Sequence, residues 1–278
     1  RHVSNIISHF TQDTPPREDW GATGRLGRAT FPISKREGPS SPLTYHNTGR
    51  LKMPKICIIP TSAGDLQGTP TGLWIEEFAA PYYMFEEKGY EIVVASLTGG
   101  PVPIDTGSMA EPFFTEISKK LMLDPKAIEY LSHTVKLDTL SFPGDFDALF
   151  MPGGHGAAVD FVGNAPLKAA IEAMYAAGKI VASVCHGPVC LVECVKPDGT
   201  PLVAGKVVTG FTDSEEDAVG KTHLVKYLIE SKFKELGGKF ERADDWHPKA
   251  VADGNLITGQ NPQSSEVTAE LVVKALSG

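Results

Sequence analysis

From Lys55 onward the chain alternates short apolar runs with longer amphipathic stretches, and this alternation limits the available folds more than any other feature. The apolar runs have strand length and lie at 55–62, 91–98, 147–154, 179–185, 206–212 and 249–259. The first five are apolar almost throughout, as expected for strands covered on both faces of a parallel sheet. The last contains Asp253-Gly254, a two-residue signal that predicts a hairpin.

Helix signals occupy the spaces between these runs. Helices are predicted at 72–89, 165–178, 221–238 and 262–278. Pro81 predicts a kink or a division in the first of them, whereas Asn261 and Pro262 form a typical start for the last. Strands that alternate with helices predict an α/β fold, with a doubly wound, mostly parallel sheet sandwiched by helices. Its functional edge is expected at the carboxyl ends of the strands.

Composition excludes several classes of protein. The 278 residues are 41% hydrophobic and 22% charged, which is enough to bury a core in one large domain or two small ones. A net charge of −8 argues against nucleic acid as a partner, and no apolar run reaches the roughly 20 residues that a bilayer span needs. The four cysteines form neither a CxxC pair nor zinc-like Cys/His spacing, so a reducing, cytoplasmic location without disulfides is expected.

Residues 1–50 differ from the rest of the chain. They are rich in Pro, Gly, Ser, Thr and Arg and show no sustained apolar periodicity. We expect either an irregular N-terminal arm, packed over the domain or a partner subunit, or the remnant of an organellar presequence that would imply import. Residues 51–278 are expected to form the α/β domain.

The run 179-KIVASVCHGP-188 places a thiol where a strand turns sharply into a predicted helix. At such an elbow the apex side chain points out of the sheet, and the residues two before and two after it must be small. Ser183 and Gly187 meet this requirement around Cys185. Because a helix N-terminus stabilises a thiolate, the sequence predicts Cys185 as an acidic nucleophile, with the adjacent His186 as its proton carrier.

A second strand end, 151-MPGGHGAAVDF-161, carries three glycines around a histidine. The backbone N–H groups of Gly153 and Gly154 are candidates to hold an oxyanion, and His155 is expected to line the pocket or to have a structural role. The GxGxxG spacing of a dinucleotide site is absent. Further candidates for the pocket wall are Trp74, Trp246 and His247.

These two motifs, followed by 209-TGFTDSEE-216, resemble the ThiJ/PfpI superfamily of class I glutamine amidotransferase-like proteins, in particular its glyoxalase III or heat-shock chaperone branch. The resemblance covers about residues 53–278. It implies a flavodoxin-like sheet with a nucleophile elbow at Cys185. It also implies a carboxylic acid beside the sulfur at Glu77, which desolvation would keep protonated. Glu76, the neighbouring candidate, should point about 100° away on a helix.

The resemblance further implies an acid that orients His186, and the pattern places it at Glu216. Asp213 and Glu215 are rival candidates in the same stretch, because acids gather at helix starts for the dipole alone. Some members of the superfamily have a metal site built from His and Glu. No matching set is recognisable in this sequence, so neither a metal nor a cofactor is expected.

The implied activity is a glutathione-independent glyoxalase that converts methylglyoxal to lactate through a hemithioacetal on Cys185. Removal of glycation adducts from proteins and a homodimer are also implied. Three alternatives stay open on the same fold: a cysteine amidase or peptidase, a stress chaperone for unfolded proteins, and a redox sensor that oxidises Cys185. A serine α/β-hydrolase is disfavoured, because no G-x-S-x-G occurs.

Overall fold

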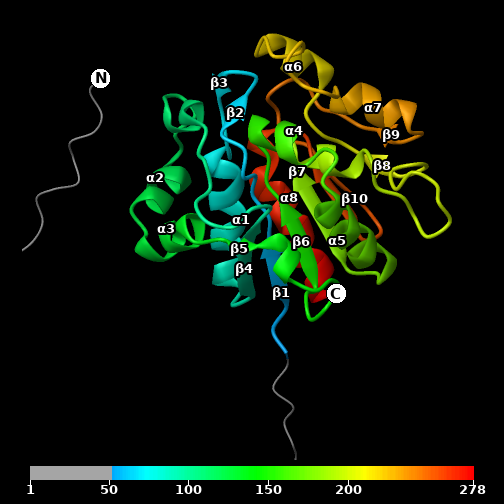
Figure 1. Cartoon of the computed structure of the whole chain (residues 1–278), viewed down its shortest axis with the longest axis horizontal. Helices are drawn as coiled ribbons and strands as arrows, with labels where there is room; N and C mark the ends of the chain where they lie inside the picture. The colour runs from blue at the N-terminus through cyan, green and yellow to red at the C-terminus, as the bar shows by residue number, and fades with distance from the viewer. Residues whose placement is uncertain (1–51) are drawn as a thin grey trace, which may run out of the picture. The chain divides into compact units, whose positions relative to one another are not determined.

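The computed structural model describes residues 52–278, so the expected N-terminal arm or presequence remnant lies outside the described residues. A seven-stranded sheet crosses the domain in the order β10-β11-β7-β6-β1-β4-β5 (Figure 1). In that order the strands are Ala250–Asp253, Leu256–Gly259, Ile180–Val184, Ala148–Met151, Lys55–Ile58, Glu91–Ser96 and Val135–Lys136. Every pairing is parallel except that of β10 with β11. The predicted mostly parallel sheet is confirmed.

The antiparallel pair is the hairpin that the sequence predicts. Asp253 pairs with Leu256 around Gly254, whose φ of 67° is a conformation that glycine adopts readily. The hairpin brings β11 alongside β7, with Gly259 opposite Val184. The end of β11 therefore lies directly beside the Cys185 elbow.

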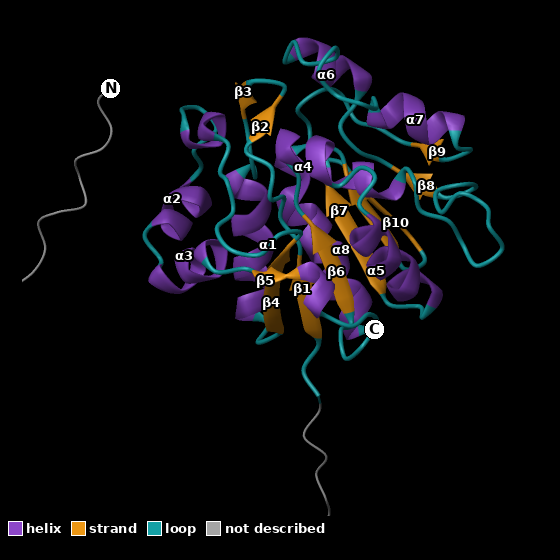
Figure 2. Cartoon of the chain, in the orientation of Figure 1, coloured by secondary structure: helices purple, strands orange, loops and turns teal. Residues whose placement is uncertain are grey.

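Helices cover both faces of the sheet (Figure 2). Helices α1 (Ile75–Glu87) and α8 (Ser265–Ser277) pack against each other, and α5 (Ala165–Ala176) packs on β6 and β7. The unit β1-α1-β4 runs along the sheet in the opposite direction to β6-α5-β7. Right-handed crossovers then place α1 and α5 on opposite faces, which makes the sheet doubly wound. Pro81 lies inside α1 without dividing it.

Smaller elements complete the described part of the chain. They include the helices α2 (Glu116–Met122), α3 (Pro125–Ser132), α4 (His155–Asp160) and α6 (Asp213–Ala218), and the strand pair β2 (Asp65–Leu66) and β3 (Thr69–Pro70). Single 3-10 turns lie at Thr106–Met109, Leu137–Thr139, Gly187–Leu191 and Pro262–Ser264. None of the helices between residues 52 and 278 combines the length and the apolar character that crossing a membrane requires.

Two expected elements are wrong in extent. The run 206–212 contributes only β8 (Val207–Val208), which pairs with β9 (Lys239–Phe240) outside the main sheet, because β11 occupies the position next to β7. The predicted helix 221–238 shrinks to α7 (Ile229–Glu235). Its first half forms turns, in which the Leu224 carbonyl accepts a hydrogen bond from Gln67.

Candidate active site

Cys185 lies at the apex of a strained turn between β7 and the Gly187–Leu191 3-10 turn. Its φ is 60°, a left-handed conformation that costs a non-glycine residue about 1–3 kcal/mol. Backbone hydrogen bonds on both sides hold the strained residue, because its N–H donates to Gly259 and its carbonyl accepts from Phe211, each at 3.0 Å. The strain and its support agree with the elbow that the sequence predicts.

The elbow packs backbone against backbone on the neighbouring strand end. A Cβ on Gly187 would lie 2.2 Å from the Met151 carbonyl oxygen, and a Cβ on Gly153 would lie 2.6 Å from the His186 nitrogen. Both distances are shorter than van der Waals contact allows, so both positions require glycine. The requirement for a small residue at Gly187 thus has a direct steric cause.

Gly187→Ala is expected to lower the free energy of unfolding by about 3 kcal/mol, because the new methyl group would have to displace the backbone of β6. Gly178→Ala is the matched control. Gly178 also has a positive φ, of 70°, but a Cβ there meets no atom within 4 Å. Its loss should be about 1 kcal/mol, from backbone strain alone. Denaturant unfolding measures both, and equal losses would contradict the proposed close packing.

The helix expected after the elbow is replaced by a 3-10 turn of five residues. So short a turn supplies little helix dipole, and the predicted stabilisation of a Cys185 thiolate by a helix N-terminus is wrong. Burial instead raises the pKa of the Cys185 thiol well above its usual value, and a charged Glu77 would raise it further. A hydrogen bond from the Gly154 backbone N–H acts in the opposite direction.

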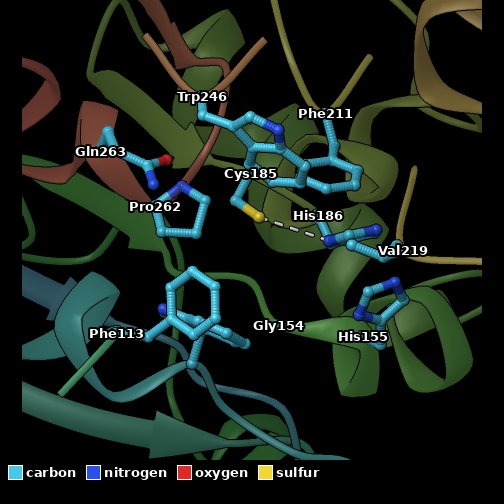
Figure 3. A pocket seen from close by; sticks show the side chains of 11 residues that line it. Phe113, Gly154, His155, Cys185, His186, Phe211, Val219, Trp246, Pro262 and Gln263 are labelled. Atoms are coloured by element: carbon cyan, nitrogen blue, oxygen red, sulfur yellow. Dashed lines mark hydrogen bonds between the residues drawn. The ribbon is translucent and has the colours of Figure 1, made fainter. Parts of the chain in front are cut away.

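A line of hydrogen bonds connects this thiol to His186 and Glu216. The Cys185 Sγ lies 3.3 Å from Nδ1 of His186 (Figure 3), and Nε2 of His186 lies 2.7 Å from Oε2 of Glu216. The histidine and the glutamate are 1% and 4% exposed, so water does not compete for these bonds. Burial alone would raise the pKa of Glu216, but His186 and His155 together lower it, which keeps the carboxylate charged.

Among the three acids proposed to orient the histidine, only Glu216 reaches it. All three lie on or near the first turn of α6, which Thr212 caps. Asp213 instead accepts a hydrogen bond from the Ser231 backbone, and Glu215 accepts one from Trp246. The three side chains project from the helix in different directions, and only that of Glu216 projects toward His186. The sequence alone did not distinguish them.

Glu77 reaches the elbow from the first turn of α1. It is fully buried, and its Oε2 accepts a hydrogen bond of 2.7 Å from the Gly153 N–H. Burial raises the pKa of Glu77 to about 8. The carboxyl is therefore protonated at neutral pH and loses its proton only as the pH rises through about 8. The nearby Cys185 side chain acts to lower this pKa, and the second carboxyl oxygen of Glu77, Oε1, has no hydrogen-bond partner among the described residues. As expected from the helical geometry, Glu76 does not enter the site. It is only half-buried and faces Glu266 on α8.

The hydrogen bond from the Gly153 N–H to Glu77 removes one of the two expected oxyanion donors. Because the Gly153 N–H is already committed to a carboxyl oxygen, it cannot also hold an oxyanion, and that expectation is wrong. The Gly154 backbone N–H, by contrast, acts on the Cys185 sulfur by lowering its pKa, and Gly154 lines the cavity beside that sulfur. The structure therefore retains Gly154 as a candidate donor.

His155 extends the line beyond Glu216. Its Nε2 lies 2.9 Å from Oε1 of Glu216, and its Nδ1 lies 3.4 Å from the Lys221 ammonium. Burial and the nearby His186 lower the pKa of His155 to about 4, so its ring is neutral. Since an ammonium can only donate, Nδ1 accepts and Nε2 must carry the proton that Glu216 receives. The lysine thus fixes the tautomer of His155.

His155, His186 and Glu216 together form a His/Glu set that the sequence reading did not recognise. Their nearest ligand atoms lie within 4.8 Å of one another. The arrangement fits a hydrogen-bonded cluster better than a metal site. Each Nε2 is close enough to donate its proton to Glu216, and the Lys221 ammonium stands 3.4 Å from the His155 ring. A divalent cation would have to displace both protons beside that positive charge.

A cavity of about 120 Å³ opens above the sulfur (Figure 3). Its wall contains Cys185, His186, His155 and Gly154, together with Trp74, Phe113, Phe211, Val219, Trp246, Pro262 and Gln263. The two tryptophans are where the sequence placed them, whereas His247 is exposed and outside the wall. Phe113 and Phe211 were missed, because Phe113 lies within a turn and Phe211 at a bend between β8 and α6, where no periodic pattern marks them.

Comparison with known proteins agrees with this geometry. The DJ-1/PfpI family model matches residues 74–275. "Glyoxalase 3" of Candida albicans is 32% identical over 239 residues, 80% of this chain and 98% of that protein. "Glutathione-independent glyoxalase HSP31" of Saccharomyces cerevisiae is 30% identical over 236 residues, with the same two coverages of 80% and 98%. The crystal structure of glyoxalase III from Candida albicans superposes with a TM-score of 0.74 and 32% identity, over 81% of this chain and 98% of that one. The chain therefore belongs to the DJ-1/PfpI family.

Proposed function

We propose that this protein is a glutathione-independent glyoxalase that converts methylglyoxal to lactate. The observation that carries the proposal is the line from Cys185 through His186 to Glu216, beside a protonated Glu77 and open to a cavity. The names of the two relatives, which cover most of this chain, support it. The reaction needs no external oxidant, because the aldehyde carbon is oxidised while the ketone carbon is reduced.

In the first step the Cys185 sulfur adds to the aldehyde carbon. The thiol proton passes to Nδ1 of His186, 3.3 Å away, whose other nitrogen lies within hydrogen-bond distance of Glu216. Negative charge develops on the former carbonyl oxygen and is held by the Gly154 N–H. That oxygen then takes the proton, and the hemithioacetal is neutral.

In the second step His186 removes the hydrogen of the sulfur-bound carbon as a proton. The electron pair forms the double bond of an enediol, and His186 passes the proton that it removed to the ketone oxygen. The hydroxyl on the sulfur-bound carbon then loses its proton to His186 and becomes the thioester carbonyl, while His186 returns that proton to the neighbouring carbon, which gives a lactate thioester of Cys185. Water then cleaves the carbon–sulfur bond, releasing lactate and restoring the thiol.

The direct test supplies methylglyoxal without glutathione and follows lactate. Lactate formation that depends on Cys185 supports the proposal, whereas an inactive wild-type protein overturns it.

The same protein samples also test the alternative functions, the amidase and the chaperone. Amide hydrolysis would favour the amidase, and suppression of aggregation by the Cys185→Ala protein would assign a chaperone role independent of the thiol. Homodimer formation and action on glycated proteins stay predictions, for which sedimentation and a glycated-peptide assay are the tests.

The pKa of Glu77 predicts an alkaline limit on the reaction. Below about pH 8 the carboxyl is protonated and can donate to sulfur, but above that pH its negative charge opposes formation of a thiolate. The value of kcat/KM should therefore fall as the pH rises through about 8. Glu77→Gln keeps a neutral donor and an acceptor for Gly153, so this fall should disappear.

Glu76→Gln is the control for that pH profile. Burial, with help from Glu266, raises the pKa of Glu76 to about 7, but its side chain lies outside the cavity wall. The alkaline fall should persist in this variant. An unchanged fall in Glu77→Gln would show that another group is responsible.

A further inference from the structure

The cavity wall is far more apolar than the smallest dicarbonyl substrates require. Four aromatic side chains contribute to it: Trp74, Phe113, Phe211 and Trp246. Trp74 and Phe113 form an edge-on pair with ring centroids 5.4 Å apart, and Phe211 and Trp246 form another at 5.9 Å. Among the described residues, no Asp, Glu, Lys or Arg side chain lines the cavity. The Gln263 amide and the two histidines supply neutral polar groups, but a charged substituent would lose water there without meeting an opposite charge.

The two aromatic pairs stand on either side of the nucleophile. Figure 3 shows Phe113 on one side of the Cys185 sulfur, with Trp246 and Phe211 on the other. Phe113 and Trp246 are 43% and 39% exposed, so they form the open rim of the cavity. Large apolar side chains left in water at the mouth of a pocket gain free energy when a ligand covers them. A substrate bound to Cys185 would extend its substituent between them.

The rim is held in place by a buried carboxylate. Trp246 has a strained φ of 63°, and its backbone N–H donates a hydrogen bond of 2.9 Å to Oε1 of Glu215. The same oxygen accepts hydrogen bonds from the side-chain amides of Gln260 and Asn261. The other oxygen, Oε2, accepts hydrogen bonds from the backbone N–H and the hydroxyl of Thr212. Glu215 is completely buried. The backbone of Trp246 is thus held by a carboxylate that four other hydrogen bonds fix in place, which preorganises this part of the rim to contact a ligand.

The volume of the cavity leaves room beyond a methyl group. The methyl group of methylglyoxal fills little of a cavity of about 120 Å³. An engineered apolar cavity of about 150 Å³ in another protein accommodates benzene. The present cavity is smaller, but its rim is open, so an aromatic ring can extend past Phe113 and Trp246. We infer, on the basis of the proposed glyoxalase activity, that the favoured substrates are 2-oxoaldehydes with a large, uncharged, apolar substituent such as phenyl. The substituent packs between Phe113 and Trp246, while the aldehyde carbon bonds to Cys185.

The test compares phenylglyoxal with methylglyoxal at low concentration, following mandelate and lactate. The value of kcat/KM should be at least about tenfold higher for phenylglyoxal, mainly through a lower KM. Lactate formation with equal or poorer use of phenylglyoxal overturns this inference and leaves the proposed function standing. If neither substrate yields a hydroxy acid, the proposed function fails and the inference fails with it.

A matched pair of variants locates the effect. Phe113→Ala removes half of one aromatic pair at an exposed position, and the preference for phenylglyoxal should fall by about tenfold. Phe114→Ala removes the neighbouring ring, which lies outside the cavity wall, and the preference should remain. A preference that survives Phe113→Ala, or falls equally in both variants, contradicts the placement of the substituent.

Discussion

Cys185→Ala is expected to reduce lactate formation from methylglyoxal by at least about 10³-fold. The reason is that no other described nucleophile lines the cavity to form the hemithioacetal. The loss should appear in kcat, since the aromatic wall that binds the substrate remains. Initial rates at saturating methylglyoxal, with chiral analysis of the lactate, measure the effect. Alanine also has a Cβ, so the backbone strain at a φ of 60° should persist in the variant. The free energy of unfolding should therefore change little, although kcat falls strongly.

Cys190→Ala is the control for that experiment. Cys190 is also a buried free cysteine, five residues away, but it lies outside the cavity wall. Its turnover should stay near that of the wild type, although loss of a buried sulfur will lower stability somewhat. Lactate formation that persists in Cys185→Ala would remove the covalent mechanism.

Glu216→Gln is expected to reduce kcat by at least about 100-fold. Both carboxylate oxygens lie within hydrogen-bond distance of histidine Nε2 atoms, at 2.7 Å for His186 and 2.9 Å for His155. An amide offers only one acceptor, so its NH2 group must face one of the two N–H donors. His155 cannot relieve the clash by changing tautomer, because its Nδ1 faces the Lys221 ammonium. His186 would lose its orientation and the charge that stabilises its protonated form.

Asp217→Asn is the control for Glu216→Gln, because it removes the same charge from the same helix at an exposed side chain. Its kcat should be unchanged. The test is a pair of Michaelis–Menten curves with thermal unfolding of each variant. If Glu216→Gln keeps its kcat, His186 does not depend on this carboxylate and the hydrogen-bonded line has no catalytic role.

The two glutamates of the site could be proposed from the sequence only through a resemblance. Nothing in the local pattern around Glu77 distinguishes it from Glu76, since both occupy the first turn of α1. Packing separates them, because Glu77 is fully buried against the elbow whereas Glu76 is only half-buried. The histidine partner was ambiguous for the same reason. Three acids share the start of α6, and their directions depend on how that helix packs.

The protonation state of the nucleophile is the main point at which local reasoning failed. A strand-to-helix junction suggested an acidic thiol, but the helix is a short 3-10 turn and burial raises the pKa of Cys185. In the proposed reaction we therefore expect proton transfer to His186 to accompany attack.

The sequence by itself determined the strands of the main sheet except β5, the hairpin at Gly254, and the elbow around Cys185 with its need for a small residue at Gly187, but it wrongly placed 206–212 in that sheet. These features follow from alternation of apolar runs and from short-range sterics, which act within a few residues. Only the tertiary structure decided that His155 and Lys221 extend the line from Glu216, that Phe113 joins the cavity wall, and that burial raises the pKa of the Cys185 thiol. Those properties depend on burial and on contacts between distant segments, and neither is encoded in any one stretch of the chain.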